Sequence, residues 1–243
     1  MKILITSPSL EPRLSGVSFR YRNLIEGLSK NNEIYVIGYD KDFHKFLPKT
    51  IKDYYYFPCM SVPTYEEQKI FNIFLFYPYF FYSMFILIKN KIDIVHVAGP
   101  DSNFILWVEL TNLLGIHLIY SHHTDITSYL DTRPKLNNSI IKAIIKKYDQ
   151  YIMEYSSVTW LMSSFFYKRL IDRHQYKIDK KKIDILKVGV DRIIFYPKYD
   201  ANLLSLWEKD SLRILLVARI SSEKYIEFVI NVIKNIKKVS LLI

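Results

Sequence analysis

KILIT (residues 2–6), FRYRNLIEGLSK (19–30) and EIYVIG (33–38) are three consecutive segments that decide the fold of this chain. The first and third are short apolar runs, which are typical of buried β-strands. The middle segment has apolar residues at the i, i+3, i+4 and i+7 spacing of one helix face. These residues are Tyr21, Leu24, Ile25 and Leu28. A strand, a helix and a strand in this order predict a parallel sheet with a crossover helix.

The same alternation continues along the chain. Strands are expected at 92–97, 117–121, 158–162 and 183–188, and helices at 102–114, 138–155 and 164–173. Repeated strand–helix alternation predicts an α/β fold, a doubly wound parallel sheet of the Rossmann-like kind. In such sheets ligands bind beyond the carboxyl ends of the strands. The residues that follow each strand are therefore the candidates for function.

We expect two domains of unequal completeness. Residues 1–195 form the first Rossmann-like domain, and 196–211, with Tyr196-Pro197, form a linker. Residues 212–243 begin a second Rossmann-like domain with one strand, one helix and a final apolar run. Since one strand–helix–strand piece does not close a core, the rest of that domain is expected to lie outside this sequence.

Charge and cysteine content narrow the function classes. The 34 Lys and Arg against 24 Asp and Glu give a formal net charge of +10, which attracts nucleic acid, anionic lipid and phosphorylated small molecules alike. A coding bias toward lysine is the alternative explanation of this charge. No helix shows the basic face that a nucleic-acid binder needs, so we expect no nucleic acid partner. The single cysteine, Cys59, excludes an internal disulfide or a cysteine zinc site, and suits a cytoplasmic protein.

The stretch 70–88 has no charged residue and approaches the length of a membrane span. It contains Asn72, Pro78 and several tyrosines, and it directly precedes the predicted strand 92–97. A span here would divide the strands of one sheet between two sides of a bilayer. A crossover helix that is buried, or that touches a membrane surface from the cytoplasm, is the favoured interpretation, with a true span as the alternative.

The loop after the first strand leads through Ser15-Gly16-Val17 into a helix. Glycine at that corner allows close approach of a ligand, and a helix N-terminus offers N–H groups to a phosphate. A simple turn glycine is the alternative. With one glycine instead of three, the loop does not match the dinucleotide-binding fingerprint, and no P-loop is present.

His122 and His123 follow the strand 117–121, with Asp125 and Tyr129 soon after. Neighbouring residues of an extended segment point in opposite directions, so the two histidines are not expected to share a metal ion. We expect instead that one histidine contacts substrate, poised by a nearby carboxylate. An Asp-x-Asp pair occurs at 40–42, but a pair of this kind is expected by chance in a chain so rich in aspartate. No metal and no cofactor are predicted.

The first strand of the second unit is followed by Arg219 and Lys224. Two cations on a strand-to-helix loop are suited to clamp a diphosphate and to stabilise a departing phosphate. An ordinary solvated loop is the alternative.

In this order and spacing, the motifs resemble the GT-B glycosyltransferases of family 4, and their pattern is most similar to sulfoquinovosyltransferase-like and related lipid glycosyltransferases. The resemblance covers nearly the whole chain. It rests on Ser15-Gly16 with Arg20 and Asn23, Ile92-Asp93-Ile94-Val95-His96 with Gly99-Pro100, Ser121-His122-His123-Thr124, Gly189-Val190-Asp191 with Phe195 and Pro197, and Arg219 with Glu223 and Lys224. Ala218 and Tyr225 depart from the family pattern, which has glycine at both positions, and the family's paired glutamates are not in this sequence.

The resemblance implies a retaining, metal-independent transfer of a sugar from a UDP- or GDP-sugar donor to a lipid or glycan acceptor. It implies a cleft between two nucleotide-fold lobes. The implied roles are the catalytic site for His123, donor binding for Gly16, Arg219 and Lys224, and acceptor binding for Arg20, Asp125 and Tyr129. Three hypotheses stay open: a membrane-surface enzyme with a lipid acceptor, an enzyme acting on a glycan or small acceptor, and a non-catalytic fragment or partner subunit.

Overall fold

The computed structural model describes most of the chain. The described residues are 1–7, 16–61, 69–70, 76–99, 101, 103–131, 138–173, 175–187, 189, 196–197, 205–207, 210–218 and 224–242. The chain divides into two compact units, Met1–Leu130 with Lys135–Val188, and Asp131–Pro134 with Gly189–Ile243. The expected domain boundary after residue 195 and the linker 196–211 stay predictions.

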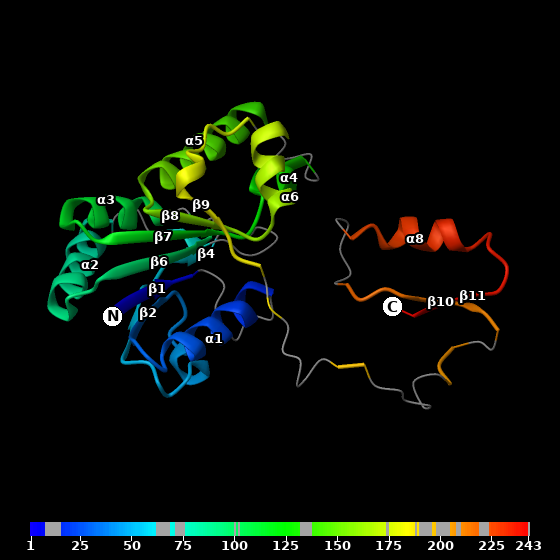
Figure 1. Ribbon diagram of the computed structural model, residues 1–243, viewed down its shortest axis with the longest axis horizontal. Coiled ribbons are helices and arrows are strands. Elements are labelled where there is room, and N and C mark those ends of the chain that lie inside the picture. The colour runs from blue at the N-terminus through cyan, green and yellow to red at the C-terminus, as the bar shows by residue number, and fades with distance from the viewer. Residues whose placement is uncertain are drawn as a thin grey trace. The chain divides into compact units, whose positions relative to one another are not determined.

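The first unit is built on a seven-stranded sheet in the order β3-β2-β1-β6-β7-β8-β9 (Figure 1). All neighbouring strands of this sheet pair in parallel. The strands are β1 (Lys2–Thr6), β2 (Glu33–Gly38), β3 (Asp53–Tyr56), β6 (Ile94–Gly99), β7 (His117–His122), β8 (Val158–Leu161) and β9 (Ile183–Ile185). A short antiparallel pair, β4 (Met60–Ser61) with β5 (Lys69–Ile70), stands apart from it. The predicted doubly wound α/β class is confirmed.

Helices cover both faces of the sheet (Figure 1). They are α1 (Gly16–Leu28), α2 (Phe76–Asn90), α3 (Phe104–Leu114), α4 (Ile126–Asp131), α5 (Ser139–Tyr155) and α6 (Ser164–Lys168), with the 3-10 turns η1 (Phe43–Phe46) and η4 (Lys180–Lys182) and the π-helical turn η3 (Arg169–Arg173). Among the described residues, no helix combines the length and the apolar character that crossing a bilayer requires.

Two separate cores follow from the strand alternation, because successive side chains point to opposite faces of a sheet. Ile3 and Ile5 of β1 pack with Tyr21 and Ile25 on the α1 side. Leu4 of the same strand packs on the other side, in the core beneath α2, α3 and α5. That larger core includes Val95, Val97, Trp107, Leu110, Leu118, Tyr120, Ile152 and Leu161. Both faces of the central strands are therefore covered, which directs ligands to the sheet edges.

Several elements differ from the sequence prediction. The edge strand β3 and the short helix α4 were not predicted. The helix expected at 164–173 ends at Lys168 and continues as the π-helical turn η3, and the strand expected at 183–188 ends at Ile185. Thr64-Tyr65-Glu66-Glu67, a capping-box pattern before the aromatic helix, lies outside the described residues. In α5, Ile140 and Ile144 follow the same helical spacing as the buried Ile152, but they are 68% and 61% exposed.

The second unit contains the parallel pair β10 (Leu212–Leu215) and β11 (Val239–Leu242), with α8 (Ile226–Ile233) between them in the chain. Its large apolar side chains remain exposed. Val217 is 85% exposed, Phe228 65% and Leu215 59%. Parallel sheets normally have both faces buried. By itself, this unit does not enclose a core.

Gly99, the last residue of β6, allows a close approach of the chain that follows it. A Cβ at this position would lie 2.0 Å from Cε2 of Phe104 and 2.8 Å from the backbone nitrogen of Asp101. Because Phe104 is fully buried, its ring has no room to yield.

We therefore predict that Gly99→Ala destabilises the protein by about 1–3 kcal/mol in urea unfolding. The matched control is Gly27→Ala, in α1, where an added Cβ meets nothing within 4 Å. This control should be neutral or stabilising by up to about 1 kcal/mol. Equal effects of the two substitutions would contradict the assigned packing at Gly99.

Candidate functional site

The carboxyl ends of β1, β6 and β7 bring together an unusual number of buried polar side chains. Thr6, Ser121, His122 and His123 are each at most 7% exposed. Register explains the meeting, because Gly99 pairs with His122 across β6 and β7, and the backbone N–H of His123 donates to the carbonyl oxygen of Gly99 over 2.9 Å. This edge is where ligands of doubly wound sheets bind.

The two neighbouring histidines face opposite sides of the sheet, as the strand alternation predicted. Nε2 of His122 lies 3.2 Å from Oδ2 of Asp149 on α5, where the Tyr176 hydroxyl also donates to the same oxygen over 3.2 Å. His123 instead contacts Tyr21 of α1, with ring centroids 5.6 Å apart. A histidine paired with a carboxylate, as expected after this strand, is therefore found at His122, whereas His123 contacts a tyrosine.

Tyr21 connects His123 to a second buried histidine. Its hydroxyl oxygen lies 2.9 Å from Nε2 of His96 and 3.4 Å from Nε2 of His123. The Ser121 hydroxyl lies 2.7 Å from the same Nε2 of His96. Tyr21 is fully buried, and His96 and Ser121 are buried almost as completely. One helix, two strands and the residue after β7 thus contribute to one hydrogen-bonded cluster, which we call the Tyr21 cluster: Tyr21, His96, Ser121 and His123.

Burial keeps both histidines of the cluster uncharged. Desolvation, followed by the charge of Arg20, lowers the pKa of His96 to about 3. The same two causes, with further contributions from the other histidines, lower the pKa of His123 to about 3. Desolvation raises the pKa of the Tyr21 phenol. At neutral pH the cluster therefore acts through directed hydrogen bonds and carries no charge of its own.

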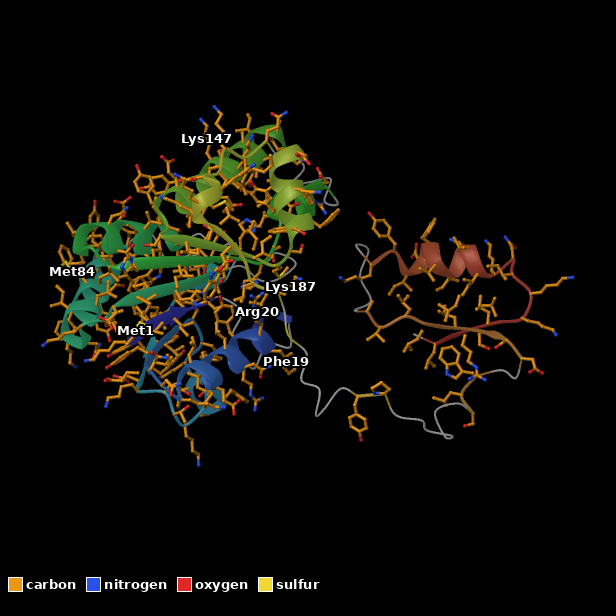
Figure 2. The ribbon with its side chains drawn as sticks, in the orientation of Figure 1. Met1, Phe19, Arg20, Met84, Lys147 and Lys187 are labelled. Carbon is orange, nitrogen blue, oxygen red and sulfur yellow. The ribbon has the colours of Figure 1, made fainter. Side chains whose placement is uncertain are left out.

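Arg20 supplies the positive charge next to this cluster. It lies on the second turn of α1, and its Nη2 donates to the carbonyl oxygen of Leu186 over 3.1 Å, close to Lys187 (Figure 2). Its Nη1 atom is buried and has no hydrogen-bond partner among the described residues. Nδ1 of His123 is buried without a partner in the same sense. Buried polar groups of this kind are candidate contacts for a ligand, and these two interact electrostatically.

Asp125 occupies a different environment from the one expected of an acceptor-binding residue. Its carboxylate accepts from the Ser128 backbone N–H over 3.1 Å and from the Thr127 hydroxyl over 2.6 Å, which caps the start of α4. It also forms an ion pair with Nε of Arg169 at 3.0 Å. Asp125 therefore anchors the loop that carries His123. Tyr129 lies on α4, and its side chain is outside the described part of the structure.

The predicted donor-binding residues are only partly described. Gly16 is exposed and is the first residue of α1. Lys224 is exposed and precedes Tyr225, whose φ of 51° places it in the left-handed region at the start of α8. Arg219 lies outside the described residues. The structure thus brings His123 and Arg20 together, and leaves the roles of Gly16, Lys224 and Arg219 as predictions.

Sequence reasoning did not single out Tyr21, His96, Asp149 or Arg169 for a site. Tyr21 had been assigned only to the buried face of its helix. A hydroxyl on that face, with a histidine in a strand that is otherwise apolar, was the available signal. Among the described residues, no three His, Cys, Asp or Glu side chains are placed to hold a metal ion.

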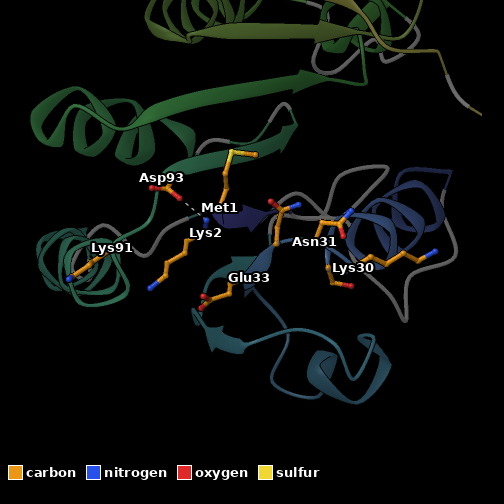
Figure 3. A pocket seen from close by; sticks show the side chains of 9 residues that line it. Met1, Lys2, Lys30, Asn31, Glu33, Lys91 and Asp93 are labelled. Carbon is orange, nitrogen blue, oxygen red and sulfur yellow. Dashed lines mark hydrogen bonds between the residues drawn. The ribbon is translucent and has the colours of Figure 1, made fainter.

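A separate hollow of about 630 Å³ lies at the opposite edge of the sheet (Figure 3). It is lined by Met1, Lys2, Ser29, Lys30, Asn31, Asn32, Glu33, Lys91 and Asp93. The backbone N–H of Lys2 donates to Asp93 over 2.8 Å, so part of the lining is already paired. Positively and negatively charged side chains both line this hollow. It lies at the amino ends of the strands, whereas ligands of doubly wound sheets bind beyond the carboxyl ends.

The family model of Glycosyltransferase Family 4 matches residues 14–192, which include the whole Tyr21 cluster and Arg20. The chain belongs to glycosyltransferase family 4. Comparison with curated proteins gives no match at the sequence level.

Solved structures place this family 4 chain among enzymes of the GT-B fold. A sucrose-phosphate synthase from Thermosynechococcus elongatus is similar with a TM-score of 0.67 and 16% identity, over 99% of this chain and 61% of the synthase. A glycosyltransferase from Rickettsia africae is similar with a TM-score of 0.60 and 17% identity, over 99% of this chain and 67% of that enzyme. MurG from Acinetobacter baumannii is similar with a TM-score of 0.50 and 12% identity, over 90% of this chain and 52% of MurG. The family 4 chain thus spans about three fifths of the synthase, and at these identities the likeness concerns the fold.

The depressed pKa values of His96 and His123 predict how stability depends on pH. Between the unfolded pKa near 6.5 and the folded values near 3, the unfolded chain binds protons that the folded chain does not. Stability is therefore fully present above about pH 6.5 and is lost on acidification, by about 1.4 kcal/mol per pH unit for each histidine.

Urea unfolding between pH 4.5 and 8 tests this on wild type and His96→Gln. In the variant, the unfolding free energy should change less steeply with pH, by the amount that corresponds to one proton, about 1.4 kcal/mol per pH unit. The control His117→Gln, at the exposed start of β7, should leave the slope unchanged. A wild-type slope in His96→Gln would show that His96 is charged in the folded protein.

Proposed function

We propose that this chain takes part in transfer of a sugar from a nucleotide-sugar donor, a UDP- or GDP-sugar, to a hydroxyl of a lipid or glycan acceptor. Membership of glycosyltransferase family 4 supports the reaction class. The single observation that supports the site is a pair of buried groups at the carboxyl edge of the sheet, Nη1 of Arg20 and Nδ1 of His123, which have no partner in the part of the chain that the structure describes.

His123 acts in this proposal by hydrogen bonding. With its pKa near 3, His123 is a neutral imidazole at neutral pH, so it does not act as a general acid, and its one ring N–H serves as a hydrogen-bond donor. Its role is to orient a hydroxyl or phosphoryl oxygen of the bound substrates, and Arg20 adds a positive charge beside it. The acceptor oxygen forms its bond to the anomeric carbon while the bond to the nucleotide phosphate breaks, and the acceptor proton passes to the departing phosphate oxygen.

Stabilisation of the departing phosphate is assigned to cations and to a helix start. Gly16 and the first N–H groups of α1 contact the donor diphosphate. Arg219 and Lys224 bind its phosphate oxygens through charge-assisted hydrogen bonds. Positioning and charge stabilisation then carry the reaction without a metal ion, and the configuration at the anomeric carbon is retained.

A non-catalytic partner subunit is the second candidate, and one observation favours it. The second unit exposes Leu215, Val217 and Phe228, so its two strands need further chain before they enclose a donor. In this alternative the first unit binds an acceptor, and another polypeptide completes the donor-binding unit.

A membrane surface is the proposed location of the acceptor, and α2 supplies the reason. Four of its residues form an exposed stripe at helical spacing, which we call the α2 stripe: Tyr77, Phe81, Phe85 and Ile88, each 56–73% exposed. Lys89 lies over the Phe85 ring at 5.5 Å. Aromatic side chains with adjacent lysine, on a chain of net charge +10, suit the headgroup region of an anionic membrane.

Transfer is tested on the protein with a panel of UDP- and GDP-sugars and release of the nucleoside diphosphate as readout. We predict that Arg219→Ala lowers kcat about 100-fold or more, since a charge-assisted contact to the leaving group is lost. His123→Ala should lower it about 100-fold by misplacing the substrate. His117→Ala, at the other end of the same strand, should retain wild-type turnover. No release with any donor would favour the partner subunit.

Membrane docking is tested by flotation with vesicles of phosphatidylglycerol and phosphatidylcholine. Phe81→Ser with Phe85→Ser should weaken binding at least about tenfold, because two aromatic rings no longer leave water. The control Phe46→Ser removes an exposed aromatic ring from η1, away from the α2 stripe. Equal binding by all three proteins would remove the membrane from the proposal and leave a glycan or small acceptor.

A further inference from the structure

We propose that Tyr21 is the positioning residue that fixes the tautomer of His123, and that Ser121 sets the direction in which Tyr21 donates. The inference rests on the proposed function, since His123 is taken to be the residue that meets substrate. It assigns roles to Tyr21, His96 and Ser121. His96 and Ser121 lie in motifs of the resemblance, which gave them no role, and Tyr21 lies in none of them.

The distances limit how the protons of the cluster are arranged. Nε2 of His96 lies within reach of two hydroxyls, 2.7 Å from Ser121 and 2.9 Å from Tyr21. A neutral imidazole nitrogen that accepts has one lone pair, so it takes one good hydrogen bond. In the proposed arrangement Nε2 of His96 is the acceptor, and the shorter contact gives that bond to Ser121.

The Tyr21 phenol also interacts with Ser121: desolvation raises the pKa of the phenol, and this interaction acts to lower it. The proposed arrangement gives the single Tyr21 proton to the other histidine. Its hydroxyl lies 3.4 Å from Nε2 of His123, within hydrogen-bonding reach. Burial holds the Tyr21 phenol and both histidines in their neutral forms, so each of these three side chains carries one polar proton. Nε2 of His123 accepts from Tyr21, and the ring proton of His123 is consequently on Nδ1.

The chemical class of the ligand atom follows from this tautomer. Nδ1 of His123 presents an N–H that has no partner among the described residues, and Nη1 of Arg20 is a second such donor. Arg20 lies close enough for its charge to lower the pKa of His123. Two donors select an acceptor oxygen, such as a phosphoryl oxygen or the lone pair of a sugar hydroxyl, and they discriminate against a group that can only donate.

The arrangement also predicts an effect at a distance. In Ser121→Ala, the lone pair on Nε2 of His96 loses its donor. The Tyr21 proton then turns to His96 over the 2.9 Å contact, and the Tyr21 oxygen accepts from His123. His123 must shift its proton from Nδ1 to Nε2. A purely structural role for Ser121 predicts no such change in a residue two positions away.

Nitrogen NMR of the histidine rings measures the tautomers directly in the 243-residue chain. The six histidines are assigned with single His→Gln variants. We expect wild-type His123 to be protonated on Nδ1, Tyr21→Phe to give a mixture of tautomers, and Ser121→Ala to give protonation on Nε2. Tyr120→Phe is the matched control, because it removes a buried hydroxyl that donates to Asp149 on the opposite face, and it should leave His123 unchanged.

Wild-type His123 protonated on Nε2 or present as a mixture would overturn the proposal, as would an unchanged tautomer in both Tyr21→Phe and Ser121→Ala. Where Tyr21→Phe does not fold, the outcome in Ser121→Ala decides. In the full-length enzyme, Tyr21→Phe should lower kcat about tenfold with little change in the KM for donor, while Tyr120→Phe should not. A protein without transferase activity would refute the proposed function and leave the NMR result standing, so the two failures are distinguishable.

Discussion

Everything at the candidate site depends on the need to satisfy polar groups that are buried where the central strands end. β1, β6 and β7 are covered on both faces, so their side chains have no water available along most of their length. At the carboxyl edge the sequence nevertheless places Ser121, His122 and His123 in this buried layer. Each residue must find a partner within the protein or leave one for a ligand. The Tyr21 hydroxyl and the Asp149 carboxylate are the two partners that the fold supplies, one on each face.

Those two partners divide adjacent histidines between different tasks. His122, tied to Asp149 and packed against Phe166, fastens α5 and α6 to the sheet. His123 contacts Tyr21, and its Nδ1 is buried without a partner among the described residues, as is Nδ1 of His122. Arg20 completes this side from the second turn of the same helix that carries Tyr21. The result is a rigid edge with two donor groups, which suits a reaction that depends on orientation more than on proton transfer by the protein.

The parts of the fold that the sequence predicted are those decided by local pattern. β1, β2 and β7 are continuous apolar runs, and α1 and α5 show clear helical periodicity, so their positions were predicted to within a few residues. β3 was not predicted because Asp53-Tyr54-Tyr55-Tyr56 has no alternation of aliphatic and polar residues. This segment forms a strand because it pairs with β2. The helix α4 was not predicted because Asp125, which caps it, is held by an ion pair with Arg169, a residue far along the chain.

The site was predictable to a similar extent and for the same reason. Strand alternation alone separated His122 from His123, and position after a strand singled out His123. The partners of these residues lie far from them in sequence: Tyr21 is 102 positions from His123, and Asp149 is 27 positions from His122. Such pairs depend on register and helix placement, which no local pattern specifies. For that reason the sequence did not specify which of the two histidines meets a carboxylate.

The central claim is that ligands bind at the carboxyl edge of the first sheet. Hydrogen–deuterium exchange of the full-length protein, with and without the nucleotide-sugar that it binds, tests this most directly. The account predicts that added ligand protects the segments Gly16–Tyr21 and His122–Asp125 and leaves Lys30–Glu33 and Lys91–Asp93 unchanged. Protection confined to these last two segments, around the hollow at the amino edge, would contradict it.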